Sequence, residues 1–538
     1  MEKDEHPSAR ACVDWEVNRD VREKTGTLSF AQHSVDVSSD TPTLELRPRC
    51  VVLPEVEAIY NRYHIHAVPA PPIHPVPNKF RPQIVKRKLA AMLIKESWRM
   101  FTRRFEKSDG YSFRTKWKAL FDRPCKYGVL SGRLGGFKPI LDKCTGCFGC
   151  VIGHPDVVKD VVVNESYLDL AKMELTAEAV ENILYEAATG KQRVSGGGYR
   201  GPFSGFGWDS IWLDMSEIVR PTRDGKEGRE YISTTAEIGR RPFRLNGGVL
   251  NVLSIQLPIV FGVQNAESID EAFLMALVGA ARNCGTLAFV QIDQMETLDE
   301  VYHPFLALSL TAREADAVVA GDHNLRTKII EVESDDSEVI RALKETLPSS
   351  ILIARLDATS NLEETAIGAL RCGADGLHIV ADRRGMETSD PGRKPRHMRD
   401  IVRSIHNSLI KEGMRSEVTL IGSGGIDLAE HVVKSIGCGL DVVAIDAAVH
   451  VALQSEVERE GQGWRAKPRL TDHKWGAQRL TNLMAAWHEQ IIEALSAMGK
   501  RDVRRLTGDE GRLILYEEMR EVAFGDIEKA GDCAHVRK

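Results

Sequence analysis

The stretch Leu420-Ile-Gly-Ser-Gly-Gly-Ile426, a helix-like segment after it, and then Asp441-Val-Val-Ala-Ile-Asp-Ala-Ala448 decide the fold of this chain. Each end of this region reads as a short buried strand, and the spacing is typical of the last two strands of a (β/α)8 barrel. Gly422, Gly424 and Gly425 lack a Cβ, so backbone amides can converge on an anion. The region therefore predicts a TIM barrel with a phosphate site after strands seven and eight. The alternative is an ordinary strand-turn-helix unit with a glycine turn.

Apolar runs that alternate with helix-like segments supply the rest of the predicted barrel. A helix is expected at 268–282, behind the first strand. The eight candidate strands are 257–262, 287–291, 317–320, 328–332, 351–356, 376–380, 418–421 and 442–445.

Length and composition limit the class of protein. A chain of 538 residues is expected to form two or three domains. Its hydrophobic content of 43% and charged content of 28% are ordinary for a soluble protein. The net charge of -6 gives no reason to expect a nucleic-acid partner or an anionic membrane surface. No apolar run reaches the length of a membrane span, and the charged first residues do not resemble a signal peptide, so we expect a cytoplasmic protein.

The region before the barrel divides by composition. Residues 1–45 are polar and read as a loose leader. The proline-dense segment 67–82 predicts an extended structural strap, with a recognition ligand as the alternative. Residues 86–105 predict an amphipathic basic helix that packs on the barrel or on a partner subunit; a membrane surface is the other interpretation. The predicted divisions are 1–120 for the leader, strap and helix, 121–194 for an iron-sulfur segment, 195–508 for the barrel and 509–538 for a tail.

Three closely spaced cysteines predict a metal centre. Cys144, Cys147 and Cys150 have the ferredoxin spacing C-x2-C-x2-C-x3-C-P, with His154 in the fourth position. A reducing compartment favours a metal site over disulfides for this pattern. The motif predicts a 4Fe-4S cluster completed by His154 or by Cys125, or a 3Fe-4S cluster that needs only the three cysteines. Zinc and a vestigial turn are the alternatives.

The segment 196–242 is rich in glycine and aromatic residues. No apolar strand precedes it, so it does not qualify as a dinucleotide-binding fingerprint. We expect a loop packed across a barrel mouth.

Several motifs in a fixed order resemble a known family. They are Phe206-Gly-Trp-Asp-Ser-Ile, Ile232-Ser-Thr-Thr-Ala-Glu-Ile-Gly-Arg-Arg-Pro, Leu257-Pro-Ile-Val-Phe-Gly, Gly373-Ala-Asp-Gly-Leu-His-Ile, Ile421-Gly-Ser-Gly-Gly-Ile and Gly476-Ala-Gln-Arg-Leu-Thr-Asn-Leu. From about 195 to 508 the chain resembles the FMN-binding domain of the glutamate synthase large subunit. The resemblance is greatest to short prokaryotic glutamate synthase-like proteins with a ferredoxin-type segment before the barrel.

The resemblance implies FMN in the barrel and assigns residues to it. In the family a lysine on the middle strand lies near the flavin pyrimidine, and Arg355 is expected to keep that positive charge here, a surface salt bridge being the alternative. His378, Asp382 and Arg383 follow the fifth or sixth strand and are candidate acid-base or substrate-binding groups. The expected cofactor-binding residues are Gly262, Arg355, Gly422, Ser423, Gly424, Gly425, Ile445, Asp446 and Ala447.

The chain also departs from the family. It has Phe261-Gly-Val-Gln-Asn-Ala and Gly285-Thr-Leu-Ala-Phe-Val-Gln-Ile-Asp where family loops contribute to the flavin and substrate pocket. The cysteine triplet expected beyond the last strand is absent, because no cysteine lies between Cys438 and Cys533. No glutaminase domain is expected, and Glu at position 2 offers no glutaminase nucleophile.

Two functions fit these observations. The first is an FMN- and iron-sulfur-dependent oxidoreductase of glutamate synthase type, which takes electrons from a ferredoxin or reductase subunit and reduces an imine or another unsaturated small-molecule substrate. The second is a noncatalytic or electron-relay subunit of a larger flavoprotein complex. A flavin-free barrel that binds a phosphate ligand is a third possibility. In each case we expect an oligomer or a complex subunit.

Overall fold

The computed structural model divides the chain by its internal contacts into two units, Met1–Pro48 and Arg49–Lys538. The leader predicted at 1–45 lies outside the described residues, all of which belong to the second unit. The structure describes residues 51–52, 65–103, 125, 127–129, 140–192, 205–215, 232–241, 251–262, 269–321, 327–334, 336–388, 393–460, 463–467 and 470–524.

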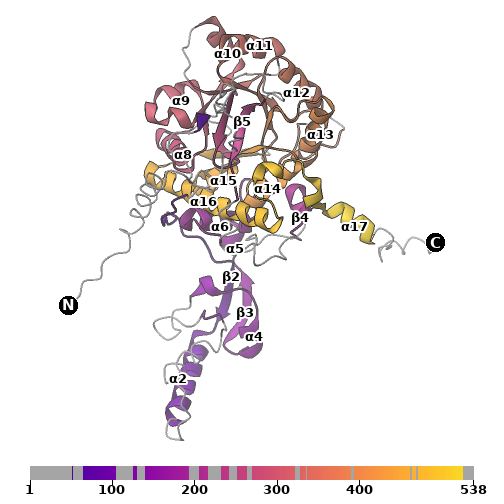
Figure 1. Ribbon diagram of the computed structural model, residues 1–538. Coiled ribbons are helices and arrows are strands. Elements are labelled where there is room, and N and C mark those ends of the chain that lie inside the picture. Colours follow the sequence, from indigo (N-terminus) through magenta and orange to yellow (C-terminus); the bar gives the residue numbers. More distant parts are fainter. Residues whose placement is uncertain are drawn as a thin grey trace, which may run out of the picture. The chain divides into compact units, whose positions relative to one another are not determined.

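Eight parallel strands close into a barrel, which confirms the predicted (β/α)8 fold (Figure 1). Hydrogen bonds join neighbours in chain order, and the last strand returns to the first through the pair Val443 and Ile259. The strands are β7 (Ile259–Phe261), β8 (Ala288–Val290), β9 (Leu306–Thr311), β10 (Ile329–Glu333), β11 (Ile351–Asp357), β12 (Gly376–Val380), β13 (Thr419–Ser423) and β14 (Val442–Ile445).

A helix follows each strand, as a parallel barrel requires. Asp270 shows how the sequence sets these helices: its side chain accepts the Phe273 N–H to start the first, and Gly285, with φ +59°, ends it. The helices are α8 (Glu271–Cys284), α9 (Ile292–Glu296), α10 (Ala312–Ala320), α11 (Ser337–Thr346), α12 (Leu362–Arg371), α13 (Met398–Lys411), α14 (Ala429–Cys438) and α15 (Ala447–Ala452), and the 3-10 turn η6 (Glu300–Phe305) follows α9.

One predicted strand is wrong. Residues 317–320 are the end of α10, and the third barrel strand is β9, which the apolar pattern missed. Thr311 and Glu314 form a capping box that starts a helix immediately before the short apolar run. A run of four small apolar residues fits a helix or a strand, and here the cap decides.

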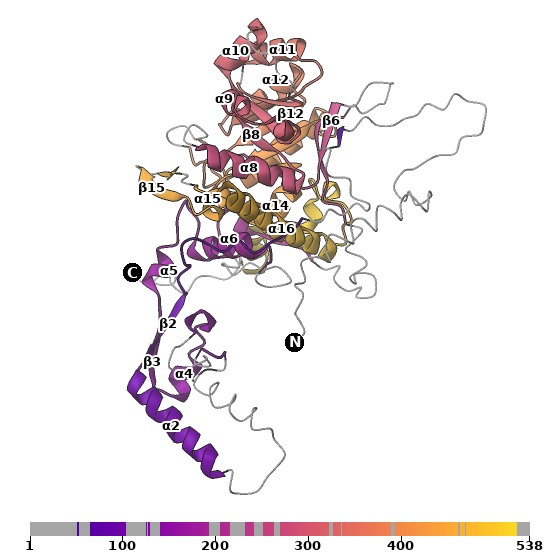
Figure 2. The same cartoon turned by 90° about the vertical axis from the view of Figure 1, so that its left-hand side faces the viewer.

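A strand pair covers the N-terminal ends of the barrel strands. β5 (Ala236–Arg240) pairs antiparallel with β6 (Asn251–Ile255), which also pairs with β1 (Val51–Val52) (Figure 2). The Gly239 N–H donates to the hydroxyl of Thr419, the first residue of β13. The prediction of a loop across the barrel mouth is therefore wrong for 236–240, which form a strand at the opposite end from the predicted phosphate site.

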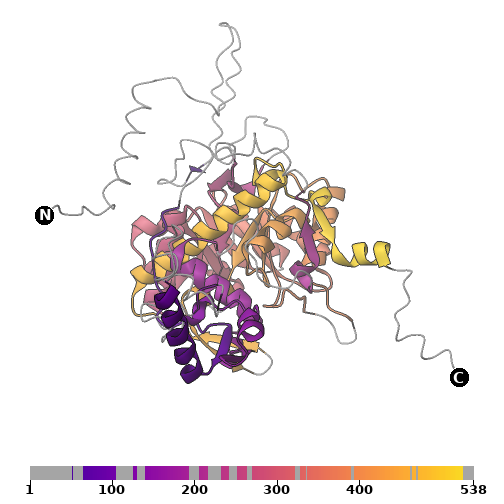
Figure 3. The same ribbon diagram turned by 90° about the horizontal axis from the view of Figure 1, so that it is seen from below.

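The helix α16 (His473–Ala497) packs against α8 and α6 (Ala177–Thr189), as Figure 2 shows from the side and Figure 3 from below. Arg479 is fully buried on α16, where it donates to the carbonyls of Ala70 and Ala452. Asn482 exchanges hydrogen bonds with the backbone of Val68. These contacts bind the proline-dense segment to α16 as a strap.

The cysteine segment has a small core of its own. β2 (Phe80–Ile84) pairs antiparallel with β3 (Val158–Val163), and the predicted basic helix is α2 (Lys86–Arg103) (Figure 1). Leu89 of α2 packs with Val157 and Val158. The helix thus packs on the cysteine segment itself.

The remaining elements are short. They are α5 (Glu165–Leu168), β4 (Ile211–Leu213), β15 (Glu456–Glu460), β16 (Gly463–Lys467), β17 (Leu513–Leu515) and α17 (Tyr516–Phe524), with 3-10 turns η3 (Gly207–Ser210), η7 (Val503–Arg505) and η8 (Glu510–Arg512). Among the helices that the structure describes, none combines the length and apolar character that a membrane crossing requires.

Candidate active site and cysteine cluster

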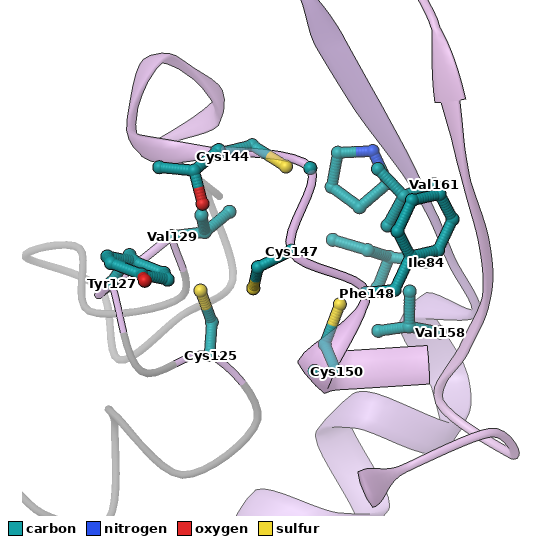
Figure 4. A pocket seen from close by; sticks show the side chains of 14 residues that line it. Ile84, Cys125, Tyr127, Val129, Cys144, Cys147, Phe148, Cys150, Val158 and Val161 are labelled. Carbon is teal, nitrogen blue, oxygen red and sulfur yellow. The ribbon is translucent and has the colours of Figure 1, made fainter. Parts of the chain in front are cut away.

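Four cysteines from two stretches of chain line one pocket of about 340 Å³. Cys125 lies 19 residues before Cys144, yet it reaches the same space as Cys144, Cys147 and Cys150 (Figure 4). Figure 4 shows Cys125, Cys147 and Cys150 directed toward one another, with Cys144 at the upper edge. The other lining side chains are mostly apolar, so the pocket surrounds the thiols with a low-dielectric wall.

The backbone around the motif is shaped to wrap a centre. Cys144 follows the 3-10 turn η2 (Leu141–Lys143), and Cys150 lies on the short helix α4 (Gly149–Gly153). Gly146 has φ +71°, and a Cβ there would lie 2.6 Å from the Phe80 ring. Only glycine fits this position, because both the dihedral angle and the ring exclude a side chain.

The thiols affect one another electrostatically. Burial raises the pKa of Cys144 and of Cys150, and negative charge on the neighbouring cysteines raises both pKa values further. Unliganded thiolates are therefore disfavoured in this pocket. A bound cation would reverse the balance, because metal binding stabilises thiolates.

The sulfur atoms lie farther apart than one zinc ion requires. Among the described His, Cys, Asp and Glu side chains, the single group of three whose ligand atoms all lie within 4.8 Å of one another is Asp209, Glu430 and His431. Four sulfurs on tetrahedral zinc would lie about 3.8 Å apart, given Zn–S bonds of about 2.3 Å.

The two alternatives for a fourth ligand differ in position. Cys125 lines the pocket, whereas His154 is the C-cap of α4 and does not. The His154 N–H donates to the Cys150 carbonyl, which ends the helix. The geometry brings Cys125, and not His154, to the three motif cysteines.

A chain of hydrogen bonds crosses the barrel interior. Ser309 donates to Glu331, whose other carboxylate oxygen lies 2.5 Å from His378 Nδ1. His378 Nε2 lies 3.0 Å from the Ser423 hydroxyl, and Phe289 stacks on the imidazole. Burial alone would raise the pKa of Glu331, but the charge and hydrogen bond of His378 hold it below its usual value. A hydrogen-bonded carboxylate–imidazole pair is therefore fixed inside the barrel.

His378 is not placed as the sequence predicted. It lies within β12, the sixth strand, and does not follow the strand. Successive residues of a strand point to opposite faces, so the imidazole points inward between Leu377 and Ile379. Only 4% of His378 is exposed.

Arg355 lies on β11 beside His378, its register partner on β12. Its guanidinium Nη1 is 3.5 Å from a Glu333 carboxylate oxygen. Its Nε is buried and has no hydrogen-bond partner in the part of the chain that the structure describes. An orphaned buried cationic N–H is costly and marks a position that a ligand acceptor would satisfy.

The glycine turn after β13 makes a close approach to a neighbouring loop. Gly424 has φ +105° and Gly425 has φ +67°. A Cβ at Gly424 would lie 2.6 Å from the carbonyl oxygens of Ala381 and Asp382, and a Cβ at Gly425 would lie 2.8 Å from the Gly385 nitrogen. The glycines are thus required by loop packing as well as being available for an anion.

A narrow crevice beside this turn contains charged groups of both signs. Arg383, Asp427 and Asp446 line it together with Gly424, Gly425, Ile426, Ala444 and Ala447. Arg383 Nε lies 3.7 Å from Asp446 Oδ2. Burial, followed by the charge of Asp446, raises the pKa of Asp427 to about 7, although Arg383 opposes the rise.

The other predicted site residues have structural contacts. Asp382 is exposed and accepts the N–H groups of Arg384 and Met386, which shapes the turn after β12. A Cβ at Gly422 would lie 2.5 Å from Leu440, away from the crevice. The Ile445 carbonyl accepts the Gly262 N–H. The loop 263–268, which follows Gly262, is outside the described residues.

Sequence reasoning missed Glu331, Ser309 and Asp427. Glu331 had a signal, since it is a charged residue inside the apolar run Ile329-Ile-Glu-Val-Glu. A carboxylate at an inward position of a buried strand requires a partner. Asp427 had no comparable signal, because an acid after a glycine turn usually lies in water.

Comparison with known proteins adds four findings. Residues 326–501 match the family model described as "Conserved region in glutamate synthase". The chain is 25% identical over 442 residues to the archaeal-type glutamate synthase (NADPH) of Dehalococcoides mccartyi, covering 68% of this chain and 86% of that protein. It is also 25% identical over 474 residues to the archaeal glutamate synthase (NADPH) of Archaeoglobus fulgidus, covering 72% and 88%. Among solved structures, a mandelate oxidase variant with 2-hydroxy-phenylacetamide is 15% identical with a TM-score of 0.36, covering 56% of this chain and 98% of that one.

Proposed function

Because this chain belongs to the glutamate synthase family, we propose that it is an FMN-dependent oxidoreductase that receives electrons at an iron-sulfur cluster and reduces an imine or another unsaturated small molecule. The pocket with four cysteines carries the proposal, because it joins a redox-type ligand set to a flavin-type barrel in one chain. The electron donor would be a ferredoxin or a reductase subunit. We expect the protein to act in the cytoplasm as an oligomer or complex subunit.

Cys125, Cys144, Cys147 and Cys150 would hold the cluster. Four thiolates match the ligand number of a 4Fe-4S cluster, and the apolar walls and backbone N–H groups of the motif are the features that tune its potential. When bound, such a cluster supplies one-electron transfer. A 3Fe-4S cluster on the three motif cysteines is the smaller alternative.

Gly424, Gly425 and the backbone of Ile445 to Ala447 would hold the FMN phosphate, and Arg355 would meet the pyrimidine ring. The orphaned Arg355 Nε supports this fit, because a flavin ring acceptor would satisfy it. When bound, FMN supplies hydride transfer. The positive charge of Arg355 favours an anionic ring.

The hydrogen-bonded pair of Glu331 and His378 would hold a proton at the barrel interior. The Glu331 carboxylate faces His378 Nδ1 and fixes a hydrogen there, while Nε2 faces Ser423. Phe289 covers the imidazole and keeps it in place. Arg383, at the crevice beside Asp446, would bind an anionic end of cofactor or substrate.

Metal and flavin analysis after purification without oxygen tests this function. We expect iron, acid-labile sulfide and FMN in the wild type, and a marked loss of iron in Cys125→Ser. His154→Ala and Cys372→Ser should retain iron, because neither side chain lines the pocket. Zinc without flavin would refute the redox function, and full iron content in Cys125→Ser would refute the ligand set.

An electron-relay subunit is the second candidate. The exposed Cys147 and Phe148 favour it, because a partner can reach the cluster side of the segment. The two carboxylates that line the crevice also oppose phosphate binding, and so disfavour a catalytic flavin at this position. Anaerobic reduction by the cognate donor, followed by electron delivery to a second protein but to no small molecule, would select this function.

A further inference from the structure

The crevice after β13 and β14 has an unusual charge for a phosphate site. Two carboxylates, Asp427 and Asp446, line it, and Arg383 is the one cation among its lining residues. Asp427 is 6% exposed and Asp446 is 8% exposed. A phosphate at Gly424 and Gly425 would therefore lie beside buried acidic groups that water does not screen.

Asp446 is also poorly satisfied by the protein. Both of its carboxylate oxygens are buried without a hydrogen-bond partner in the described part of the molecule. Its polar neighbours lie farther away, Arg383 Nε at 3.7 Å and His450 Nε2 at 3.4 Å. A buried carboxylate without hydrogen bonds is costly, so this position calls for a proton or a ligand donor.

The chain also supplies its own anions to the helix that follows the glycine turn. Asp427 lies two residues before α14, and Glu430 lies in its first turn. A helix N-terminus attracts negative groups through its dipole, and two acidic side chains of the chain itself already lie near this one. Arg383, which a phosphate would also need, is paired with Asp446.

We propose that Asp446 and Asp427 couple anion binding at this crevice to the uptake of a proton, so that the phosphate of FMN enters only when the two carboxylates together carry a single charge or none. This inference rests on the proposed flavin site. Asp446 and Asp427 thereby determine which charge state of a ligand can bind in the crevice.

The direction of the pH dependence follows from the charged and titratable groups around Asp427 and Asp446. Arg383, from the loop after β12, and His450, on α15, face Asp446, and the His431 Nδ1 accepts the Asp427 N–H. Lys172 and Glu174 flank Met173, which packs on Ala447, and Glu174 is paired with Arg384. The pKa of Asp427 is raised to about 7. A dianion raises it further, so FMN binding should weaken as the pH rises above 7.

The test measures the FMN and riboflavin affinity of the full-length apoprotein by flavin fluorescence, from pH 6 to pH 8.5. The wild type should lose up to about tenfold in FMN affinity per pH unit above pH 7, whereas riboflavin, which has no phosphate, should show no such slope. Asp446→Asn should bind FMN about tenfold or more tightly at pH 8. Asp427→Asn should remove the slope. Glu174→Gln, a nearby charge outside the crevice, is the matched control and should behave as wild type.

A phosphate monoester itself titrates near pH 6, and Asp427→Asn separates this from the carboxylate pair, because only the carboxylate slope disappears. FMN binding that is pH-independent, or that both substitutions leave unchanged within twofold, would overturn the inference alone. No FMN or riboflavin binding by wild type and variants at pH 6 would overturn the flavin site and this inference with it.

Discussion

His397 should make the stability of this protein fall in mild acid, and the substitution His397→Asn tests this. His397 is the N-cap of α13, and its Nδ1 accepts the Arg399 N–H at 3.0 Å. A Cβ at Gly207 would lie 2.3 Å from its Nε2, and a Cβ at Gly385 would lie 2.8 Å away. The ring is thus enclosed on the side where an imidazolium would need water. Protonation of Nδ1 would also break the cap.

The magnitude follows from the pKa difference. Burial, followed by the charge of Arg399, lowers the pKa of His397 from 6.5 to about 4. Because the folded pKa lies below the unfolded one, the contribution is complete above pH 6.5 and is lost as the pH falls toward 4. A shift of about 2.5 pKa units corresponds to about 3 kcal/mol of unfolding free energy.

The assay is urea unfolding, followed by circular dichroism, at pH 7, 5.5 and 4.5. Asparagine keeps an N-cap acceptor but does not titrate, so the variant should be less stable at pH 7 through lost packing against Trp208, yet should lose less stability on acidification. His473→Asn, at an exposed histidine, is the control and should match the wild-type slope. Equal pH slopes in His397→Asn and the wild type would refute the reasoning.

Three further perturbations test the packing of the site. Gly424→Ala should cost about 2–4 kcal/mol, whereas Gly413→Ala, also at positive φ but with open space around its Cβ, should cost about 1 kcal/mol; equal losses of urea stability would refute the role of the loop contact. Glu331→Gln should cost about 3–5 kcal/mol at pH 7 by leaving His378 without its carboxylate, and less in acid, because the lowered pKa of Glu331 makes its contribution vanish as the pH falls through the folded value. Arg479→Met should lower the melting temperature by several degrees and leave the iron content unchanged. Arg371→Met, at an exposed arginine, is the control and should be nearly neutral. Loss of iron in Arg479→Met would contradict the expectation that α16 packing and the cysteine pocket are independent.

The fold was readable from sequence because barrel strands are local signals. Seven of the eight predicted apolar runs overlap the observed strands, since a strand buried on both faces needs only a short apolar segment. The error at 317–320 arose where apolar content and helix capping compete. The missed strand, β9, begins directly after the 3-10 turn η6, which contains Pro304. The alternation of apolar residues therefore does not indicate where this strand begins.

The sequence predicted three residues of the cysteine site but did not decide the fourth. Cys144, Cys147 and Cys150 are local in sequence, so their convergence follows from the turn that joins them. The choice between Cys125 and His154 depends on how β2, η2 and α4 pack. Spacing alone favours His154, whereas Cys125 is the residue that lines the pocket.

The charge of the phosphate crevice was the least readable feature. Gly424 and Gly425 predict where backbone amides are accessible, but an anion site is the sum of those amides and every charge that burial leaves unscreened. The sequence predicted that the backbone of Asp446 would contact the phosphate. That its carboxylate lies in the same crevice as Asp427 follows only from the folded structure. A glycine motif therefore predicts where backbone amides can bind an anion. The protonation of two carboxylates from different loops decides which anion that site accepts.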